Sequence, residues 1–396
     1  MIKPISVLQF TNSNVRAGVE EHMLMLLRGL DRRRFRLNVV CPPELARRIQ
    51  QDLPEDVNLF PLDLNGPTQF GAMLSLGRIL RQQRVGILHS HMFWSSLFAS
   101  PVGWLNRVPL IVETAHGREA WRKGWKASFF IDRCIGRSVD QYIAVSTANA
   151  RYLIEEKKYS ARKVSVVHPG CDFRKFATGM PEPPGLRRSL GFGESDPVMV
   201  IVARLEPQKG HRILLEALSA VLKDFPNVRL VVVGEGSQRS DLESLARAMD
   251  LTRAIRFIGY SPDVREWLAL ATLTVLPSFH EGLPVTPIEA LASGKPVVAT
   301  AVDGTTDVVI DGKTGLTVPP GDPRALADGI CRLLQNPDLA RCLADEGRRW
   351  VLKNFSVEHM IQQTEEFYLE HWRNSRRTKR AGLQVHKPAQ SVLARK

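Results

Sequence analysis

Short runs of Val, Ile and Leu alternate with segments of helical periodicity along almost the whole chain. In the first half, seven such runs are predicted to be strands, and the pattern starts again in the second half with five more. This alternation is typical of βαβ units, in which parallel strands are buried on both faces and helices cover the sheet. The predicted strands are 5–10, 37–41, 57–62, 85–89, 110–114, 142–145, 164–168, 198–203, 228–233, 255–258, 273–276 and 297–299.

A segment rich in Pro and Gly interrupts this pattern in the middle of the chain, from Pro169 to Gly185. The sequence therefore predicts two Rossmann-like α/β domains that face each other across a cleft, because parallel sheets bind ligands at the carboxyl ends of their strands. The expected divisions are a first domain at 1–168, a linker at 169–190, a second domain at 191–355, a helix at 356–372 that packs back toward the first domain, and a basic flexible tail at 373–396.

Composition excludes several classes of protein. With 396 residues, of which 44% are hydrophobic and 24% charged, the chain suits two globular domains and is neither disordered nor fibrous. Five widely spaced cysteines without a C-x-x-C pair indicate a reducing compartment. The first residues lack the apolar stretch of a secretory signal, and the uncharged segment 85–106 contains His, Ser and Pro, which favours a strand and a helix over a membrane span. We therefore expect a cytoplasmic protein.

The net charge of +13 is concentrated at the end of the chain. Residues 373–396 hold eight Lys or Arg and no Asp or Glu, which leaves +5 for the rest. Such a tail would be attracted to anionic lipid or nucleic acid. A solvated end without a partner is an equally good interpretation.

The most informative motif is Ser278-Phe-His-Glu-Gly-Leu-Pro-Val-Thr-Pro-Ile-Glu-Ala-Leu-Ala-Ser-Gly-Lys-Pro296. It predicts a loop after a strand, and then a helix from about Pro284 to Gly294. Proline suits the first turn of a helix, where backbone N–H groups have no partner within the helix. The N–H groups of Val285 and Thr286 would then face the cleft at the positive end of the helix dipole, which favours a phosphate.

Two carboxylates of this motif, Glu281 and Glu289, are candidates for binding hydroxyl groups. Eight helical residues span about 12 Å, so the pair suits groups on either side of a diphosphate better than one shared proton transfer. A carboxylate can accept two hydrogen bonds from a vicinal diol, as in a sugar or ribose. Taken alone, Glu281 is also interpretable as a surface acid, and Glu289 as a partner of its helix dipole.

A second candidate group follows the first strand of the second half, in Val202-Ala-Arg-Leu-Glu-Pro-Gln-Lys-Gly210. Arg204 and Lys209 flank a turn, so both cations could reach an anion at the strand ends. Fixed cations stabilise a leaving diphosphate most in the transition state, as its bond to the sugar breaks. A pair with this spacing is also common in ordinary surface turns.

The first half offers weaker candidates. Gly18 opens the helix after the first strand, where it permits close approach of a ligand to the backbone. His116 follows the fifth strand, where an imidazole could hydrogen-bond a sugar hydroxyl or a phosphate. His89, His91 and His168 are interpreted as structural hydrogen-bonding residues.

Several motifs are absent from the sequence. There is no Asp-x-Asp and no His/Cys cluster in the sequence, so we expect no metal site. Neither G-x-x-x-x-G-K-[ST] nor G-x-G-x-x-G occurs, which argues against a P-loop NTPase and an ordinary NAD enzyme. The charge of a diphosphate must then be met by Arg, Lys and the helix dipole.

Together these motifs resemble those of the family 4 glycosyltransferases, which have the GT-B fold. The resemblance spans roughly residues 5–370 and is most specific in the motif from Glu281 to Thr300. The Arg204/Lys209 turn, the Ala17-Gly18 loop and the linker at 167–172 add to it. It implies transfer of a sugar from a nucleotide-sugar donor to an acceptor, with retention of anomeric configuration and without a metal or a cofactor.

The resemblance also implies a role for each candidate residue. Arg204 and Lys209 would hold the diphosphate, and Glu281 the hydroxyls of the donor sugar. The remaining expectations are that Glu289 binds the ribose, that Val285 and Thr286 give backbone N–H groups to phosphate, that Gly18 is the first-turn glycine, and that His116 lies beside the transferred sugar. Of these, Arg204, Lys209, Glu281 and His116 are predicted to be catalytic and the others to bind the donor.

The sequence departs from the family pattern at two places. Ala17-Gly18 stands where a Gly-Gly pair is common, which affects how closely that loop can approach a ligand. Asp307 stands where the family commonly has Glu. We interpret Asp307 as a shorter equivalent near the donor side.

The acceptor is expected to bind the first half. Residues 118–130 interleave aromatic and basic side chains, which suits a membrane surface, although a core helix with solvated cations is the alternative. We expect a glycan or lipid-linked acceptor, peripheral contact with the inner face of an anionic membrane, no nucleic-acid partner, and a place in bacterial cell-surface polysaccharide or glycolipid synthesis.

Two other functions fit the same motifs. A nucleotide-sugar epimerase of this architecture would need acid/base groups near the sugar in place of an acceptor face. A non-catalytic nucleotide-sugar-binding protein would be free to lose Arg204, Lys209, Glu281 and Glu289, which argues against it. UDP, GDP and ADP remain open as the nucleotide.

Overall fold

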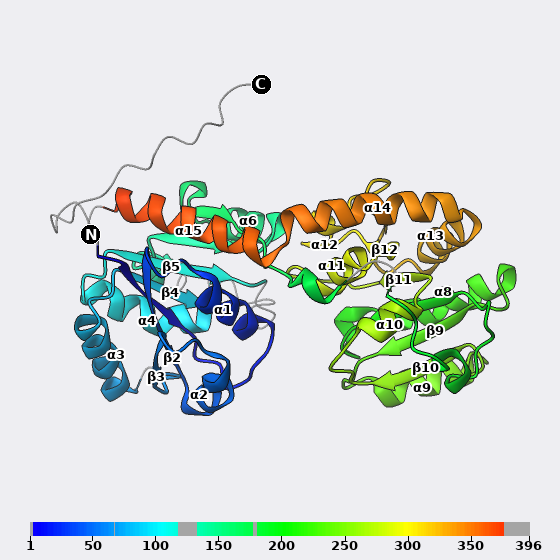
Figure 1. Cartoon of the computed structure of the whole chain (residues 1–396), viewed down its shortest axis with the longest axis horizontal. Helices are drawn as coiled ribbons and strands as arrows, with labels where there is room; N and C mark the ends of the chain where they lie inside the picture. Colours follow the sequence, from blue (N-terminus) through cyan, green and yellow to red (C-terminus); the bar gives the residue numbers. More distant parts are fainter. Residues whose placement is uncertain (1–2, 67, 118–132, 177–179, 376–396) are drawn as a thin grey trace, which may run out of the picture.

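The chain folds into two α/β domains, each built on one parallel sheet flanked by helices (Figure 1). The computed structural model describes residues 3–66, 68–117, 133–176 and 180–375. The predicted fold class, two Rossmann-like domains, is confirmed.

In the described part of the first domain, seven parallel strands follow the order β3-β2-β1-β4-β5-β6-β7. Strands β4 and β5 are buried along their whole length, although their carboxyl ends carry polar side chains such as His89, His91 and Glu113. The order reverses between β1 and β4, and such a switch point opens a crevice at the carboxyl edge of the sheet. The strands are β1 (Ile5–Phe10), β2 (Phe35–Cys41), β3 (Asn58–Pro61), β4 (Ile87–His91), β5 (Leu110–Ala115), β6 (Gln141–Ala144) and β7 (Val164–Val166), and the helices are α1 (Gly18–Gly29), α2 (Pro43–Ile49), α3 (Phe70–Gln82), α4 (Phe93–Leu105) and α6 (Thr147–Arg151).

The second domain has six described strands in the order β10-β9-β8-β11-β12-β13, with its switch point between β8 and β11. The three-residue strand β13 (Leu316–Val318) is missing from the sequence prediction because Gly315 and Pro319 on either side of it are typical of a loop. The other strands are β8 (Val198–Val202), β9 (Arg229–Val233), β10 (Ile255–Gly259), β11 (Leu273–Leu276) and β12 (Val297–Thr300), and the helices are α7 (Leu186–Ser189), α8 (His211–Asp224), α9 (Arg239–Ala248), α10 (Arg265–Leu270), α11 (Val285–Ala292), α12 (Thr305–Val308), α13 (Pro323–Gln335) and α14 (Pro337–Asn354). The last helix, α15 (Val357–Asn374), follows the second domain in the chain.

Strand β8 shows how the second core is built. Met199 and Ile201 join a buried cluster with α8 and α13, whereas Val198 and Val200 join a second cluster with α10. Successive side chains of a strand point to opposite faces, so this strand contributes to both layers. Each fully buried side chain of this size stabilises the fold by about 1.5–3 kcal/mol relative to exposure.

The final helix α15 returns to the first domain and packs along it (Figure 1). Its side chains Met360, Phe367 and Tyr368 belong to the same buried cluster as residues of β1 and α1. The Tyr368 hydroxyl accepts a hydrogen bond from Gln9 Nε2 at 3.1 Å. The end of the chain therefore forms part of the first core.

The chain crosses between the domains twice, and the two crossings touch each other. The first crossing follows β7, and the second lies between α14 and α15. The backbone N–H of Cys171 donates to the carbonyl of Phe355 at 2.7 Å, and Cys171 forms an isolated parallel bridge with Ser356. A Cβ on Gly170 would lie only 2.6 Å from Val357 Cα, so this close approach requires glycine.

Within the described residues, no helix combines the length and the apolar character needed to cross a bilayer. The uncharged segment 85–106 forms the buried strand β4 and the helix α4. This outcome is the one predicted.

Candidate active site

Two loops meet at the switch point of the second sheet, one after β8 and one after β11. Gly210 ends the first loop with a φ of +68°, and a Cβ there would lie 2.0 Å from the carbonyl oxygen of Pro277 in the second. Phe279 N–H donates to the Gln208 carbonyl at 2.7 Å and joins the loops directly. Glycine at position 210 is therefore needed both for its backbone conformation and for the contact.

This contact places Lys209 beside Glu281. Lys209 Nζ lies 2.6 Å from Glu281 Oε1, and the two side chains are only 15% and 7% exposed. Ser278 Oγ donates to the same carboxylate oxygen at 2.6 Å, and the Glu281 N–H donates to Asp303 Oδ2 at 3.0 Å. The carboxylate is thus held in one position, with a cation at its side.

Arg204 lies in the same loop as Lys209 but has a different environment. It is exposed, and among the described residues no carboxylate forms an ion pair with its guanidinium group. Glu206, two residues away, accepts hydrogen bonds from Ser237 instead. The Arg204 cation is therefore available to an anion.

Helix α11 begins beside these loops, at Val285. Its N-cap residue is Pro284, which offers no side-chain hydrogen bond to the first turn. Thr286 Oγ1 donates to the carbonyl of Val202 at 3.0 Å and fixes the helix start against the end of β8. The positive end of the helix therefore lies next to the loop that carries Arg204 and Lys209.

Glu289 lies in the second turn of α11. Burial raises the pKa of its carboxyl to about 7, and the positive charge of Lys175 partly offsets this rise. A carboxyl that titrates near neutral pH is typical of a functional site.

In the first domain, Gly18 is the first residue of α1. No described heavy atom lies within 4 Å of where its Cβ would be, so the space beside it is open. The N-terminus of helix α1 is capped by a side chain of its own first turn, because Glu20 Oε2 accepts a hydrogen bond from the N–H of Ala17 at 3.1 Å. Within the described residues, no contact requires glycine at position 18, and its expected role in ligand approach stays a prediction.

His116 is not alone at the rim of the first sheet. Its Nε2 lies 3.4 Å from Nδ1 of His91, and the His22 ring lies 5.1 Å away between centroids. Burial lowers the pKa of His22 to about 4 and that of His116 well below its ordinary value. Sequence reasoning missed this cluster because its members lie on three separate elements, and only the sheet brings them together.

The two domains also approach each other at glycines. A Cβ on Gly282, in the second domain, would lie 2.5 Å from the carbonyl oxygen of His116 in the first domain. Within the second domain, a Cβ on Gly304 would lie 2.0 Å from the Gly282 carbonyl oxygen. The same Gly304 Cβ would be 2.9 Å from Ser146 Cβ. Backbone therefore meets backbone across the cleft, with the His116 loop facing the Glu281 loop.

Asp307, one of the two departures from the family pattern, joins the domains. Its Oδ2 accepts from the Thr147 N–H at 2.6 Å and lies 3.2 Å from His168 Nε2. Burial acts to raise the pKa of this carboxyl, but the hydrogen bonds from His168 and Thr147 outweigh it and lower the pKa. His168, predicted to be structural, thus has a hydrogen-bonding partner in the other domain.

The comparisons with known proteins agree with this geometry. Residues 184–350 match the family described as "Glycosyl transferases group 1", and residues 16–175 match "Glycosyltransferase Family 4". The chain belongs to the family 4 glycosyltransferases. It is therefore a glycosyltransferase with a nucleotide-sugar donor, so the predicted family and the predicted glycosyltransferase activity are confirmed.

Curated relatives of this glycosyltransferase differ in what they act on. The chain is 33% identical to the D-inositol 3-phosphate glycosyltransferase of Nocardioides sp., over 58% of this chain and 54% of that protein. It is 22% identical to the UDP-Gal:alpha-D-GlcNAc-diphosphoundecaprenol alpha-1,3-galactosyltransferase of Escherichia coli, over 89% of this chain and 94% of the relative.

Solved structures share the fold of this glycosyltransferase. The crystal structure of Anabaena HepE in complex with UDP covers 93% of this chain and 100% of its own, with a TM-score of 0.80 and 20% identity. A glycosyltransferase from Rickettsia africae covers 94% of this chain and 100% of its own, with a TM-score of 0.79 and 23% identity. Both likenesses support the predicted GT-B architecture.

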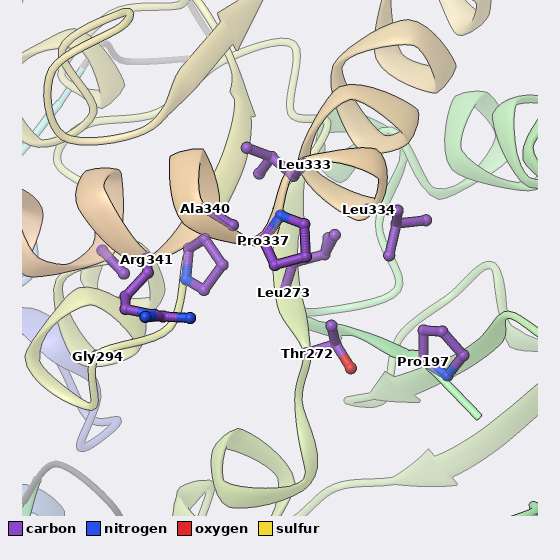
Figure 2. A pocket seen from close by; sticks show the side chains of 11 residues that line it. Pro197, Thr272, Leu273, Gly294, Leu333, Leu334, Pro337, Ala340 and Arg341 are labelled. Carbon is purple, nitrogen blue, oxygen red and sulfur yellow. The ribbon is translucent and has the colours of Figure 1, made fainter. Parts of the chain in front are cut away.

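A pocket of about 320 Å³ lies elsewhere on the glycosyltransferase, at the amino ends of strands of the second sheet. Figure 2 shows the residues that line it. Its lining includes Pro197, Thr272 and Leu273, which precede or begin strands, together with Leu333 of α13 and Arg341 of α14. These positions mark the amino ends of the strands, whereas the candidate site lies at the carboxyl ends. The pocket is therefore separate from the candidate donor site.

The structure thus brings Lys209 and Glu281 into contact and places Arg204, Val285 and Thr286 close by on adjoining elements. Their individual roles stay predictions, as do those of Gly18, His116 and Glu289. The aromatic and basic segment at 118–130, predicted to meet a membrane, lies outside the described residues.

Proposed function

We propose that the protein is a retaining, metal-independent glycosyltransferase that adds a sugar to a lipid-linked glycan acceptor. The setting is bacterial cell-surface polysaccharide or glycolipid synthesis at the inner face of the membrane. The second domain holds the nucleotide sugar, and the first domain presents the acceptor. No cofactor takes part.

The observation that carries this proposal is the contact between Lys209 and Glu281, 2.6 Å apart at the switch point. The cation and the carboxylate suit the junction between a diphosphate and a sugar, since an ammonium group binds phosphate and a carboxylate accepts hydrogen bonds from hydroxyls. The exposed cation Arg204 and the start of α11 adjoin this pair. A diphosphate can thus be bound by two cations and a helix terminus, without a divalent metal.

The proposed reaction follows from these charged groups. The bond between the anomeric carbon and the diphosphate oxygen breaks, and the developing negative charge is stabilised by Arg204, Lys209 and the dipole of α11. The acceptor oxygen bonds to the same face of the anomeric carbon, and its proton passes to the departing phosphate oxygen. Retention of configuration follows, and no enzyme nucleophile is needed.

Two observations favour a lipid-linked acceptor. The relative from Escherichia coli, similar over nearly its whole length, is named for a diphosphoundecaprenol-linked acceptor and an alpha linkage. In this chain, residues 64–112 contain no Asp or Glu but four Arg, and the helices α3 and α4 within this segment expose large apolar side chains. These are Phe70, Leu74, Trp104 and Leu105, which are 52–70% exposed. Basic and apolar groups together suit an anionic bilayer.

The test is a transfer assay in EDTA with UDP-, GDP- and ADP-sugars and undecaprenyl-linked acceptors in anionic vesicles. We expect one donor class to be used, and the NMR spectrum of the product to show the anomeric configuration of the donor. An inverted product would refute the retaining mechanism. Release of an altered sugar without an acceptor would identify an epimerase.

Donor affinity is expected to depend on pH through Glu289. Because burial raises its pKa to about 7, the carboxyl of the free enzyme is neutral at lower pH. Ribose hydroxyls donate to the ionised form, so the Kd for a nucleotide sugar should rise up to about tenfold per pH unit below 7 and level off above it. By the same shift, ionising this carboxyl destabilises the unliganded fold as pH rises through about 7.

Calorimetric titration between pH 5.5 and 8.5 checks this expectation. A nucleotide sugar is the right probe because its diphosphate keeps its charge across this range. Glu289→Gln should abolish the pH dependence, whereas Glu194→Gln, at an exposed loop position, should preserve it. A pH profile shared by both variants would contradict the assignment.

A further inference from the structure

A hydrogen-bond network runs from the final helix α15 to His116 at the rim of the first sheet. Gln9 Nε2 donates to the Tyr368 hydroxyl at 3.1 Å, and Gln9 Oε1 lies 2.8 Å from His91 Nε2. His91 Nδ1 in turn lies 3.4 Å from His116 Nε2. The first three of these side chains are fully buried, whereas His116 is partly exposed. The network therefore links the last helix of the chain to a ring at the cleft.

This network sets which nitrogen of each imidazole carries the proton. Burial lowers the pKa of His91 and that of His116 well below the usual value, so both rings are neutral at pH 7. A neutral imidazole has one N–H group and one lone pair, so the hydrogen bond at one nitrogen fixes the role of the other. Gln9 Oε1 can only accept, so the His91 proton is on Nε2 and its Nδ1 carries the lone pair. This lone pair accepts from the Nε2–H of His116, whose own lone pair is then on Nδ1.

The other end of the network is anchored by a second histidine of β4. The Tyr368 hydroxyl accepts from Gln9 and donates to His89 Nδ1, 2.5 Å away. The proton of His89 is then on Nε2, which lies 2.6 Å from Thr114 Oγ1 and donates to it. Burial lowers the pKa of His89 to about 3 and raises that of Tyr368, so neither group ionises at neutral pH. Each of these donors therefore meets an acceptor.

The lone pair of His116 Nδ1 is left for a ligand. Among the described residues, no group forms a hydrogen bond with this nitrogen, and the ring is partly exposed. The His116 backbone meets the second domain at Gly282, beside the loop of Glu281. An unprotonated nitrogen accepts a hydrogen bond from a hydroxyl group, whereas it has no proton to give to the oxygens of a phosphate. This tautomer therefore suits a sugar and not the diphosphate.

We propose that Gln9 and Tyr368 are positioning residues for His116. Through His91 they hold it in the tautomer whose Nδ1 is unprotonated, and this nitrogen accepts a hydrogen bond from a sugar hydroxyl in the cleft. The inference deepens the proposed function and rests on it for the sugar, but the tautomer itself depends on no ligand. Without the Tyr368 hydroxyl, the Gln9 amide would be able to turn over, which reverses each hydrogen bond up to His116 and makes its Nδ1 a donor.

The tautomer can be measured by NMR on the full-length protein labelled with ¹⁵N in histidine, with the His116 signals assigned by their loss in His116→Gln. At pH 7 without a ligand, we expect the wild-type proton on Nε2 and an unprotonated Nδ1. Tyr368→Phe and Gln9→Leu should each give a mixture of both tautomers. Tyr142→Phe removes a buried hydroxyl from β6, outside this network, and as the matched control should keep the wild-type tautomer. A wild-type proton on Nδ1, or an unchanged tautomer in both network variants, would overturn the proposal.

The same spectra identify the group that His116 meets. Addition of UDP-, GDP- or ADP-sugars should shift the Nδ1 resonance of His116, whereas the free nucleotides should leave it in place. A shift produced equally by the free nucleotides would assign His116 to the diphosphate and contradict the proposal. The tautomer experiment needs no substrate, so failure of the proposed function would be recognised separately.

Transfer kinetics separate positioning from a purely structural role. Tyr368→Phe should lower kcat/KM about tenfold, the effect of one lost hydrogen bond at the site. In a His116→Ala background the same substitution should have almost no effect, because no imidazole is left to orient. An equal loss in both backgrounds would show that the Tyr368 hydroxyl acts independently of His116, and the positioning role would be refuted.

Discussion

Replacing Lys209 with alanine is expected to lower kcat about 100- to 1,000-fold. The Lys209 ammonium group lies 2.6 Å from Glu281 Oε1, where it can meet both the carboxylate and the departing diphosphate. Charge on the diphosphate grows as the glycosidic bond breaks, so a fixed cation contributes most in the transition state, and loss of one such group costs this much in other enzymes. The KM for the donor should change less than kcat.

Steady-state transfer assays, paired with thermal unfolding, measure this effect. Arg204→Ala should also lower kcat strongly, and Lys209→Arg should recover part of the loss because it keeps the charge. The control is Lys223→Ala, at an exposed position near the end of α8, for which wild-type turnover is expected. Near-normal kcat in both Lys209→Ala and Arg204→Ala would rule out stabilisation of the leaving group by this loop.

Gly282→Ala is expected to lower kcat/KM about 100-fold while the unfolding temperature changes little. The added Cβ would lie 2.5 Å from the His116 carbonyl oxygen, so the two loops must move apart by several tenths of an ångström. Small displacements of reacting groups cost this much in rate, because attack requires close alignment. Each domain has its own core, so the contact contributes little to folding.

Gly71→Ala is a suitable control, because no described heavy atom lies within 4 Å of a Cβ at that position of α3. It should leave both kcat/KM and stability close to wild type. If Gly282→Ala kept wild-type kcat/KM, the approach of the two loops would be irrelevant to catalysis. A large fall in its unfolding temperature would instead make the contact a structural one.

Most of the fold could be predicted from the sequence, because buried parallel strands appear in it as short apolar runs. Strands such as β8 and β11 are largely apolar and buried on both faces, and the loops that follow them contain Gly and Pro. The sequence prediction failed where this apolar pattern is weak. Strand β13 is three residues long, and its pairing with β12 depends on tertiary contacts that no local pattern encodes.

The candidate site could be predicted from the sequence better in the second domain than in the first. In the second domain, the residues lie in two continuous loops, so spacing along the chain already placed Lys209 and Glu281 near the same strand ends. In the first domain, His22, His91 and His116 are separated by long stretches of chain, and their meeting depends on the order of β1, β4 and β5. The contact of Asp307 with Thr147 could not be predicted from the sequence either, because it joins two domains.

The paired crossings at Cys171 and Ser356 limit how the two domains can move. Two connections bonded side by side resist sliding of one domain over the other and resist twisting about the long axis of the molecule. Rotation about the line through both crossings is the motion that remains easy. Entry of the donor and departure of the product nucleotide would then both depend on one hinge angle between the two domains.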